Sequence, residues 1–404
     1  MLKSRLCIAF FAFAVGCAPA QKPLTDYVNP MLGTATLWDS VDLGFKPTKR
    51  TWGAEVFPGS SLPNAMVQVS PVTKFHSGAG YQYEDSVIYG FTHTNKGHWN
   101  LCHIPLLPVT GTPTPGDYCS PFSHERESAA PGYYQVFLDR YGVDAQLSST
   151  LRCAFHKYTY PAGAAASLLA DLQRSNEHVR AWDIRKEGDN VFAGWQQTGE
   201  KMYFYAVANR PVTGIEPVVE GDREVRIVRF GEGDGALELR IGFSFVSEKN
   251  ARENLEAEML GKSFAEVRSE ATATWNDLLG RIRVEGGTER EKGLFYSSLY
   301  RSFLWPALRS DVNGEFTDVD GKVINPGFRY YTGPSYWDDY RNKLILLGML
   351  APDVAADVIS SDTDKGEKRG GFMPTFFHGD HASAFVAGTY LRGNRGFDVN
   401  RAYN

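Results

Sequence analysis

Residues 330–341 combine aromatic rings with charged groups in the stretch Tyr330-Tyr331-Thr332-Gly333-Pro334-Ser335-Tyr336-Trp337-Asp338-Asp339-Tyr340-Arg341. Glycine and proline break the backbone here, and the apolar run Leu344-Ile345-Leu346-Leu347 follows. We therefore expect Ser335 to cap a buried helix that begins at this cluster. Aromatic faces beside carboxylates suit a sugar ring, because carboxylates accept hydrogen bonds from neighbouring hydroxyls. The alternative is an ordinary helix start, with carboxylates at the amino-terminal end, where the helix dipole favours negative charge, and with tyrosines in the core.

Distinctive blocks also lie on either side of this stretch. Three blocks precede it: Gly53-Ala54-Glu55-Val56-Phe57-Pro58-Gly59 with its continuation Leu62 to Pro71, Gly80-Tyr81-Gln82-Tyr83, and Gly90-Phe91-Thr92-His93-Thr94. One block follows, from Gly370-Gly371-Phe372-Met373-Pro374 through His378-Gly379-Asp380-His381-Ala382-Ser383 to Gly396-Phe397-Asp398. In this order, and together with the Trp337-Asp338 stretch, the blocks resemble glycoside hydrolase family 92.

The resemblance implies a calcium-dependent, inverting α-mannosidase of the α-1,2 type that removes terminal mannose from glycans. It also implies a β-sandwich followed by an (α/α)6 barrel. Asp338 matches the aspartate that binds mannose hydroxyls in the family. Trp337 would form the pocket wall, and Arg341 would orient Asp338 as a charge-assisted partner. Asp339 departs from the family's usual threonine and is expected to face solvent.

Four further residues belong to the expected site or its surroundings. We expect the loop from His93 to Trp99 to edge the sugar pocket from the β-rich side, with Trp99 as a platform. Asp380 and His381 match a family block, and we expect them to support the site rather than to touch the sugar. Together with Trp337, Asp338 and Arg341, these residues form the predicted substrate site and its support; no metal ligands are assigned.

An inverting glycosidase needs two carboxyl groups, one as acid and one as base, roughly 6.5–9.5 Å apart. The resemblance implies a glutamate acid and an aspartate base in later barrel motifs, and neither motif is present. Glu367 lies in a segment expected to be a charged loop. We therefore expect a truncated chain without catalytic acid, base or most calcium ligands. The alternative function is a non-catalytic carbohydrate-binding or inert protein.

The composition is that of an ordinary globular protein, and the amino-terminal segment predicts export from the cytoplasm. The chain has 404 residues and a net charge of -5, which gives no electrostatic case for binding nucleic acid. Residues 1–20 resemble a signal peptide, with Lys3 and Arg5 before a short apolar stretch. We expect lipidation at Cys17, with ordinary cleavage after Ala20 as the alternative. The protein would then be periplasmic or on the cell surface, with a lipid anchor as its only membrane contact.

The period of the apolar pattern divides the chain into segments. Alternating residues predict strands, among them a hairpin of 133–138 with 143–147, so residues 25–247 are expected to form an antiparallel β-sandwich. Helical spacing predicts a linker helix over 248–285 and the first helices of the barrel over 286–404. The predicted fold class is therefore α+β multidomain, with the barrel incomplete. Cys102, Cys119 and Cys153 show no disulfide framework, although one bridge would fit.

Overall fold

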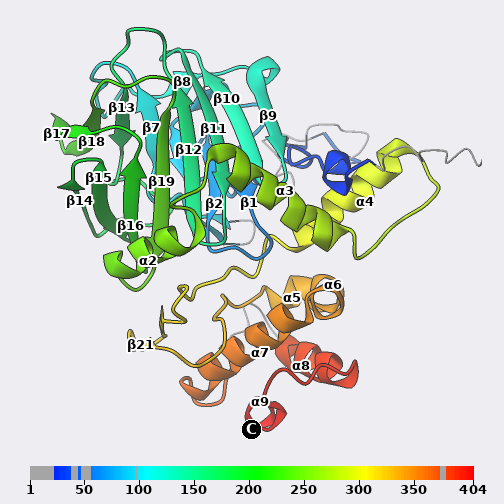
Figure 1. Ribbon diagram of the computed structural model, residues 1–404. Coiled ribbons are helices and arrows are strands. Elements are labelled where there is room, and N and C mark those ends of the chain that lie inside the picture. Colours follow the sequence, from blue (N-terminus) through cyan, green and yellow to red (C-terminus); the bar gives the residue numbers. More distant parts are fainter. Residues whose placement is uncertain (1–21, 38–43, 47–55, 97–98, 374–378) are drawn as a thin grey trace, which may run out of the picture.

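The computed structural model describes residues 22–37, 44–46, 56–96, 99–373 and 379–404, and for residues 95, 96, 99 and 100 only the backbone. A β-rich domain comes first and a helical part follows it (Figure 1). This arrangement agrees with the predicted α+β class.

Two large antiparallel sheets build the β-rich domain. The first has seven strands in the order β1 (Ser60–Ser61), β2 (Gln68–Val72), β4 (Gly90–Thr92), β7 (Leu106–Val109), β13 (Ser167–Ala170), β18 (Arg223–Phe230) and β17 (Val212–Glu220). The second has eight strands in the order β14 (Ala181–Gly188), β15 (Val191–Gln197), β16 (Lys201–Ala208), β19 (Leu237–Ser244), β12 (Cys153–Thr159), β11 (Val143–Ser149), β10 (Tyr133–Leu138) and β9 (Glu127–Ala130).

Three short pairs complete the described strands: β3 (Val87–Ile88) with β8 (Ser120–Pro121), β5 (Asn95–Lys96) with β6 (Trp99–Asn100), and β20 (Phe316–Thr317) with β21 (Val323–Ile324). Two 3-10 turns are also present: η1 (Leu24–Tyr27) packs against α3 (Phe264–Leu279) and α4 (Glu289–Ser302), and η2 (His124–Arg126) packs against β10.

Alternating side chains explain why these segments are strands. In β16 every second residue is buried, which places one face of the strand toward the core. The predicted hairpin is confirmed, because β10 pairs with β11 from Tyr133 opposite Ser148 to Leu138 opposite Val143. Gly142 turns the chain between them with a φ of 64°, a conformation that glycine adopts readily.

One apolar core joins the two sheets to the helices. It includes Phe91 and Ile227 from the seven-stranded sheet and Val136 and Phe204 from the eight-stranded sheet. Trp275, from a helix that follows the strands, belongs to the same core and is fully buried. Burial of this much apolar surface is the main stabilising contribution to the domain.

Two helices cover the outer face of the eight-stranded sheet (Figure 1). They are α2 (Glu248–Glu258) and α3 (Phe264–Leu279), and a second core forms where Leu255 and Phe264 meet Phe155. The sequence predicted one linker helix over 248–285, whereas the structure has two. The second helix starts anew because Ser263 and Glu266 form a reciprocal capping box.

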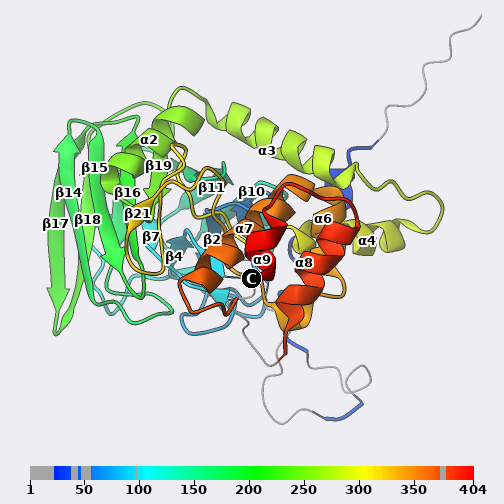
Figure 2. The ribbon, with the colours of Figure 1, turned by 90° about the horizontal axis from the view of Figure 1, so that it is seen from below.

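The described helical part contains α4 (Glu289–Ser302), α5 (Tyr336–Asp339), α6 (Lys343–Leu350), α7 (Pro352–Glu367), α8 (His381–Leu391) and α9 (Val399–Tyr403). Helices α6 to α9 lie below the β-rich domain in Figure 1, and they are in front of the sheets in the view from below (Figure 2). Across the described ranges, we find no helix long and apolar enough to cross a membrane. Among the described residues, Cys102, Cys119 and Cys153 form no disulfide.

Residues of the block 62–71 hold the helical part against the β-rich domain. The Asn64 amide donates to the carbonyl of Phe303 at 2.6 Å, and its side chain donates to the carbonyl of Pro306 at 2.8 Å. Gln68 donates to the carbonyl of Leu304 at 2.7 Å. This block, quoted above for its resemblance, therefore fixes the start of the segment that leads to the site.

A buried carboxylate also connects the β-rich domain to the helical part. Asp311 accepts hydrogen bonds from Ser244 at 2.7 Å, Asn250 at 2.9 Å and Asn254 at 2.7 Å. Burial raises the pKa of Asp311, and these donors partly offset that effect. The residue connects β19, α2 and the segment that precedes β20.

Candidate functional site

The Trp337-Asp338 stretch forms a short helix, α5, directly after the Gly333-Pro334 break. The carbonyl of Ser335 accepts the amides of Asp338 and Asp339, both at 3.0 Å. The Ser335 side chain accepts no hydrogen bond from the helix, so the predicted side-chain cap is wrong. The hydroxyl instead donates to Asp338 Oδ2 at 2.6 Å, because this carboxylate is a stronger acceptor within reach.

The chain breaks again before the apolar run. Asn342 accepts the amide of Lys343 at 2.5 Å and caps a separate helix, α6, where the sequence predicted a single helix start. Leu344, Leu347 and Leu350 then bury one face of α6. The break leaves the residues between the two helices at a surface hollow.

That hollow has a volume of about 390 Å³ and is the candidate site. Its lining residues come from α5, the break and the start of α8: Trp337, Asp338, Tyr340, Arg341, Asn342 and His381. Trp337 is 55% exposed, so part of its aromatic side chain lies at the surface of the hollow. Three of the five residues predicted to bind substrate, Trp337, Asp338 and Arg341, are therefore brought together.

An aromatic stack joins the two sides of the hollow. The rings of Tyr340 and His381 lie 4.4 Å apart at an angle of 9°. Arg341 donates through Nε to the Tyr340 hydroxyl at 2.6 Å. Among the described contacts Arg341 forms no ion pair with Asp338, and its role as a partner of that carboxylate stays a prediction.

The second adjacent carboxylate does not face solvent as expected. Asp339 lies 2.7 Å from Lys343 Nζ, and its side chain is only 14% exposed. This ion pair spans the break between α5 and α6. Asp339 is therefore part of the support, and Asp338 is the carboxylate that faces the hollow.

Asp380 and His381 are neighbours in sequence, but one of them caps a helix and the other lines the hollow. Asp380 caps α8, accepting the Ser383 amide at 3.2 Å and the Ser383 hydroxyl at 2.6 Å. His381 is the next residue, and its ring lines the hollow itself. Asp380 thus acts on the site only by fixing the start of the helix that carries His381.

A buried polar group holds α5 in place from beneath. Tyr336 is fully buried and donates to Asp362 Oδ2 at 2.5 Å, and burial raises its pKa. Lys365 donates to Asp362 Oδ1 at 2.8 Å and to the carbonyl of Tyr331 at 2.9 Å. These bonds fix the residue next to Trp337, which orients the exposed ring.

Of the two predicted residues of the β-rich domain, His93 is described in full and does not line this hollow. His93 is fully buried, lies 3.0 Å from His156 (Nε2 to Nε2) and contacts Phe243. Burial lowers the pKa of His93 to about 3, so the ring is neutral at ordinary pH. The side chain of Trp99 and all of Cys17 lie outside the described residues, so both assignments stay predictions.

The hollow does not supply the requirements of acid–base hydrolysis or of a calcium site. Asp338 is the one carboxylate among its described lining residues. Glu367, expected in a loop, ends α7 and pairs with Arg401 at 2.7 Å. Calcium takes six to eight oxygen ligands, yet no group of three or more His, Cys, Asp or Glu side chains in the described ranges could hold a metal. The described residues therefore do not fit a calcium ion.

Sequence analysis missed two lining residues, Tyr340 and Asn342. Both lie within or directly after the quoted stretch. Asparagine directly before the apolar run is a typical helix cap, and this signal predicts the break that exposes them.

Comparison with known proteins identifies the family. A model of the glycosyl hydrolase family 92 N-terminal domain matches residues 27–253, and a model of the family's catalytic domain matches residues 250–404. The chain belongs to glycoside hydrolase family 92.

Solved structures are similar along nearly the whole chain. The family GH92 α-mannosidase BT3965 from Bacteroides thetaiotaomicron is 26% identical with a TM-score of 0.85, over 95% of this chain and 56% of that protein. The family GH92 inverting mannosidase BT2199 of the same organism is 25% identical with a TM-score of 0.82, over 94% and 54%. BT3965 has also been solved with mannoimidazole.

A curated relative, an uncharacterized secreted glycosidase of Arthroderma benhamiae, is 24% identical over 72% of this chain. The chain spans 42% of the length of that relative.

Proposed function

We propose that the protein hydrolyses terminal α-linked mannose from glycans, with a preference of the α-1,2 type and inversion at the anomeric carbon. The observation that carries this proposal is the hollow that the half-exposed Trp337 and the Asp338 carboxylate line together. The similarity to two solved family 92 mannosidases supports it.

The residues of the hollow suit the binding of a sugar ring. The indole of Trp337 packs against the apolar face of a pyranose, while Asp338 accepts hydrogen bonds from adjacent hydroxyls. Ser335 holds Asp338 Oδ2, so the carboxylate is oriented before a ligand arrives. Asn342 and Arg341 add donors at the rim, and the Tyr340–His381 stack closes one side.

We assign Asp338 to binding and not to proton transfer. An inverting reaction needs two carboxyl groups on opposite ring faces, and the described lining provides one. We therefore propose that the acid and the base lie outside the described hollow, as the sequence motifs lead us to expect. Calcium dependence, which the resemblance implies, stays part of the proposal, but no step is assigned to the ion.

Export also belongs to the proposal. We place the protein in the periplasm or on the cell surface, with lipidation at Cys17 as the anchor. The secreted relative supports export. Incorporation of radiolabelled palmitate that survives Cys17→Ser would contradict this anchor.

A second candidate function is carbohydrate binding without catalysis. The single carboxylate among the hollow's described lining residues favours it. In that case mannosides bind to the protein, yet it releases no mannose.

The test is mannose release by the purified complete gene product. α-1,2-Mannobiose is incubated with the protein, with and without a chelator, beside matched glucosides and galactosides. We expect mannose from the mannobiose alone and a loss of release with chelator. Cleavage of another glycoside but not of mannosides contradicts the proposal; saturable mannobiose binding without release selects the second candidate.

A further inference from the structure

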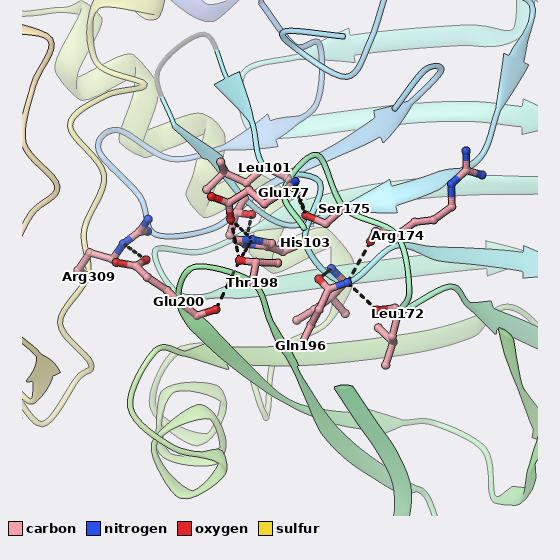
Figure 3. Close-up of polar contacts among 12 residues, drawn as sticks. Leu101, His103, Leu172, Arg174, Ser175, Glu177, Gln196, Thr198, Glu200 and Arg309 are labelled. Atoms are coloured by element: carbon pink, nitrogen blue, oxygen red, sulfur yellow. Dashed lines mark hydrogen bonds and ion pairs between the residues drawn. The ribbon is translucent and has the colours of Figure 1, made fainter. Parts of the chain in front are cut away.

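A second polar group lies where the β-rich domain meets the segment after α4. Arg309 comes from that segment, Glu200 from the turn between β15 and β16, and Glu177 from the loop before β14 (Figure 3). None of the three lines the hollow at Trp337. The group is therefore distinct from the candidate site.

Arg309 is a buried cation with incomplete partners. It is 8% exposed, and its guanidinium carbon lies 4.2 Å from the centre of the Phe245 ring. Its nearest ion-pair distance, from Nε to Glu200 Oε2, is 3.7 Å, and Nη1 has no hydrogen-bond partner among the described residues. Burial lowers the pKa of Arg309, which reflects the cost of desolvating this charge. A buried donor left without an acceptor is destabilising, so this arginine is suited to bind an added acceptor.

The neighbouring Glu177 carboxylate is held in a fixed orientation. It accepts from Thr198 Oγ1 at 2.6 Å and lies 3.0 Å from His103 Nε2, while the Glu177 side chain stays 39% exposed. His103 is in turn 2.9 Å from Thr94 through Nδ1. The residues on either side of His103, Cys102 and Ile104, both have a φ of 53°.

That backbone conformation is costly for residues with side chains, and it persists only where the surroundings enforce it. The strain here places the His103 ring against Glu177. His103 is thus a positioning residue for the carboxylate.

We propose that Arg309, Glu200 and Glu177 form a second glycan-binding site, which takes adjacent hydroxyls of a neutral sugar. A hydroxyl both donates and accepts, so it can accept from the guanidinium and donate to a carboxylate. Two glutamates disfavour an anion, and the arginine disfavours a cation. The identity of its ligand, a mannose-containing glycan, rests on the proposed function.

Backbone hydrogen bonds connect this group to the segment that leads to the hollow at Trp337. The amide of Arg309 donates to the carbonyl of Tyr330 at 2.7 Å, and the amide of Thr332 donates to the carbonyl of Ala307 at 2.9 Å. The chain then runs from Thr332 directly into α5 and Trp337. Because one pair of segments anchors both sites, we assign the second site to units beyond the terminal mannose.

The test is NMR of the arginine Nε–Hε resonances of the 15N-labelled protein. Arg309→Lys identifies the Arg309 signal, and the probes are α-1,2-mannotriose, methyl α-mannopyranoside and formate. We expect mannotriose to shift the Arg309 resonance saturably, and methyl α-mannopyranoside to shift it much less at the same concentration.

Two matched variants separate this site from a general charge effect. Glu200→Gln should raise the Kd for mannotriose by about tenfold or more, because it weakens a charge-assisted hydrogen bond. Glu216→Gln changes a similar pair, with Arg229 Nε at 3.0 Å, on the seven-stranded sheet. This control should leave the Kd within about twofold.

Three results would overturn the inference: an Arg309 resonance that no saccharide moves, a shift produced by formate but not by mannotriose, or equal Kd values for the two variants. Mannose release is measured separately. A shift without release therefore contradicts the proposed activity and leaves the site, whereas release without a shift removes the site and leaves the activity.

Discussion

Replacing Lys365 with methionine tests the group that supports α5. Lys365 Nζ bonds Asp362 at 2.8 Å and the Tyr331 carbonyl at 2.9 Å, and the Asp362 side chain is fully buried. Lys365→Met keeps a long apolar side chain but leaves a buried carboxylate without its cation. Loss of one partner of a buried ion pair costs about 3–5 kcal/mol of unfolding free energy.

The assay is urea unfolding of the 404-residue protein, followed by circular dichroism and tryptophan fluorescence. With typical urea dependences, this loss lowers the midpoint of the helical transition by about 1 M or more. Arg401→Gln is the matched control, because its pair with Glu367 is 47% exposed on both sides. Such a pair contributes at most about 1 kcal/mol.

Equal midpoints for Lys365→Met and Arg401→Gln would refute the reasoning. They would show that the Tyr336–Asp362–Lys365 group does not support α5. The orientation of Trp337 would then need another explanation.

Three further predictions follow from the contacts above. Asp338→Ala should lower the catalytic efficiency of the complete gene product at least about tenfold, because each lost hydrogen bond to a sugar hydroxyl is worth roughly 1.5–3 kcal/mol. Asp339→Ala should lower the rate less and the thermal stability more. The reverse order, with both variants folded, contradicts the assignment. The pKa of His93 falls from 6.5 to about 3 on folding, so the unfolded chain binds more protons between these values. Urea midpoints should therefore rise with pH across that window, and His93→Gln should reduce the slope by up to about 1.4 kcal/mol per pH unit; an unchanged slope excludes His93 as the cause. Asp311→Ala removes an acceptor that Ser244, Asn250 and Asn254 share, although each of the two asparagine amides keeps one other acceptor. It should cost about 3 kcal/mol or more in urea unfolding, against about 0.5 kcal/mol or less for the exposed Asp234→Ala.

The strands could be predicted because their signal is local. Alternation along Lys201–Ala208 reports directly which side chains face the core. Along Cys153–Thr159 the first four residues are all buried, because Phe155 packs against Leu255 and Phe264 on the outer face. The helix break at Asn342 was also within reach, since a capping asparagine stands before the apolar run. The order of the strands in the two sheets was not, because β13 pairs with β7 and β18 across more than fifty residues of intervening chain.

The site was predictable only in its central part. Trp337 and Asp338 are adjacent in sequence and line one hollow, so the aromatic and charged stretch together with the family resemblance located them. Arg341 bonds Tyr340, whose ring stacks on His381, and this stack brings together the break after α5 and the start of α8. Arg309 and Glu200 lie more than one hundred residues apart, and no local pattern indicates that they meet.

The most direct test of the central claim is 1H NMR of the anomeric signals during hydrolysis of α-1,2-mannobiose by the complete gene product. The account predicts β-mannose as the first product, formed at least about tenfold more slowly by Asp338→Ala. α-Mannose as the first product would contradict the inverting mechanism. An equal rate for a folded Asp338→Ala variant would contradict the claim that the hollow at Trp337 holds the sugar.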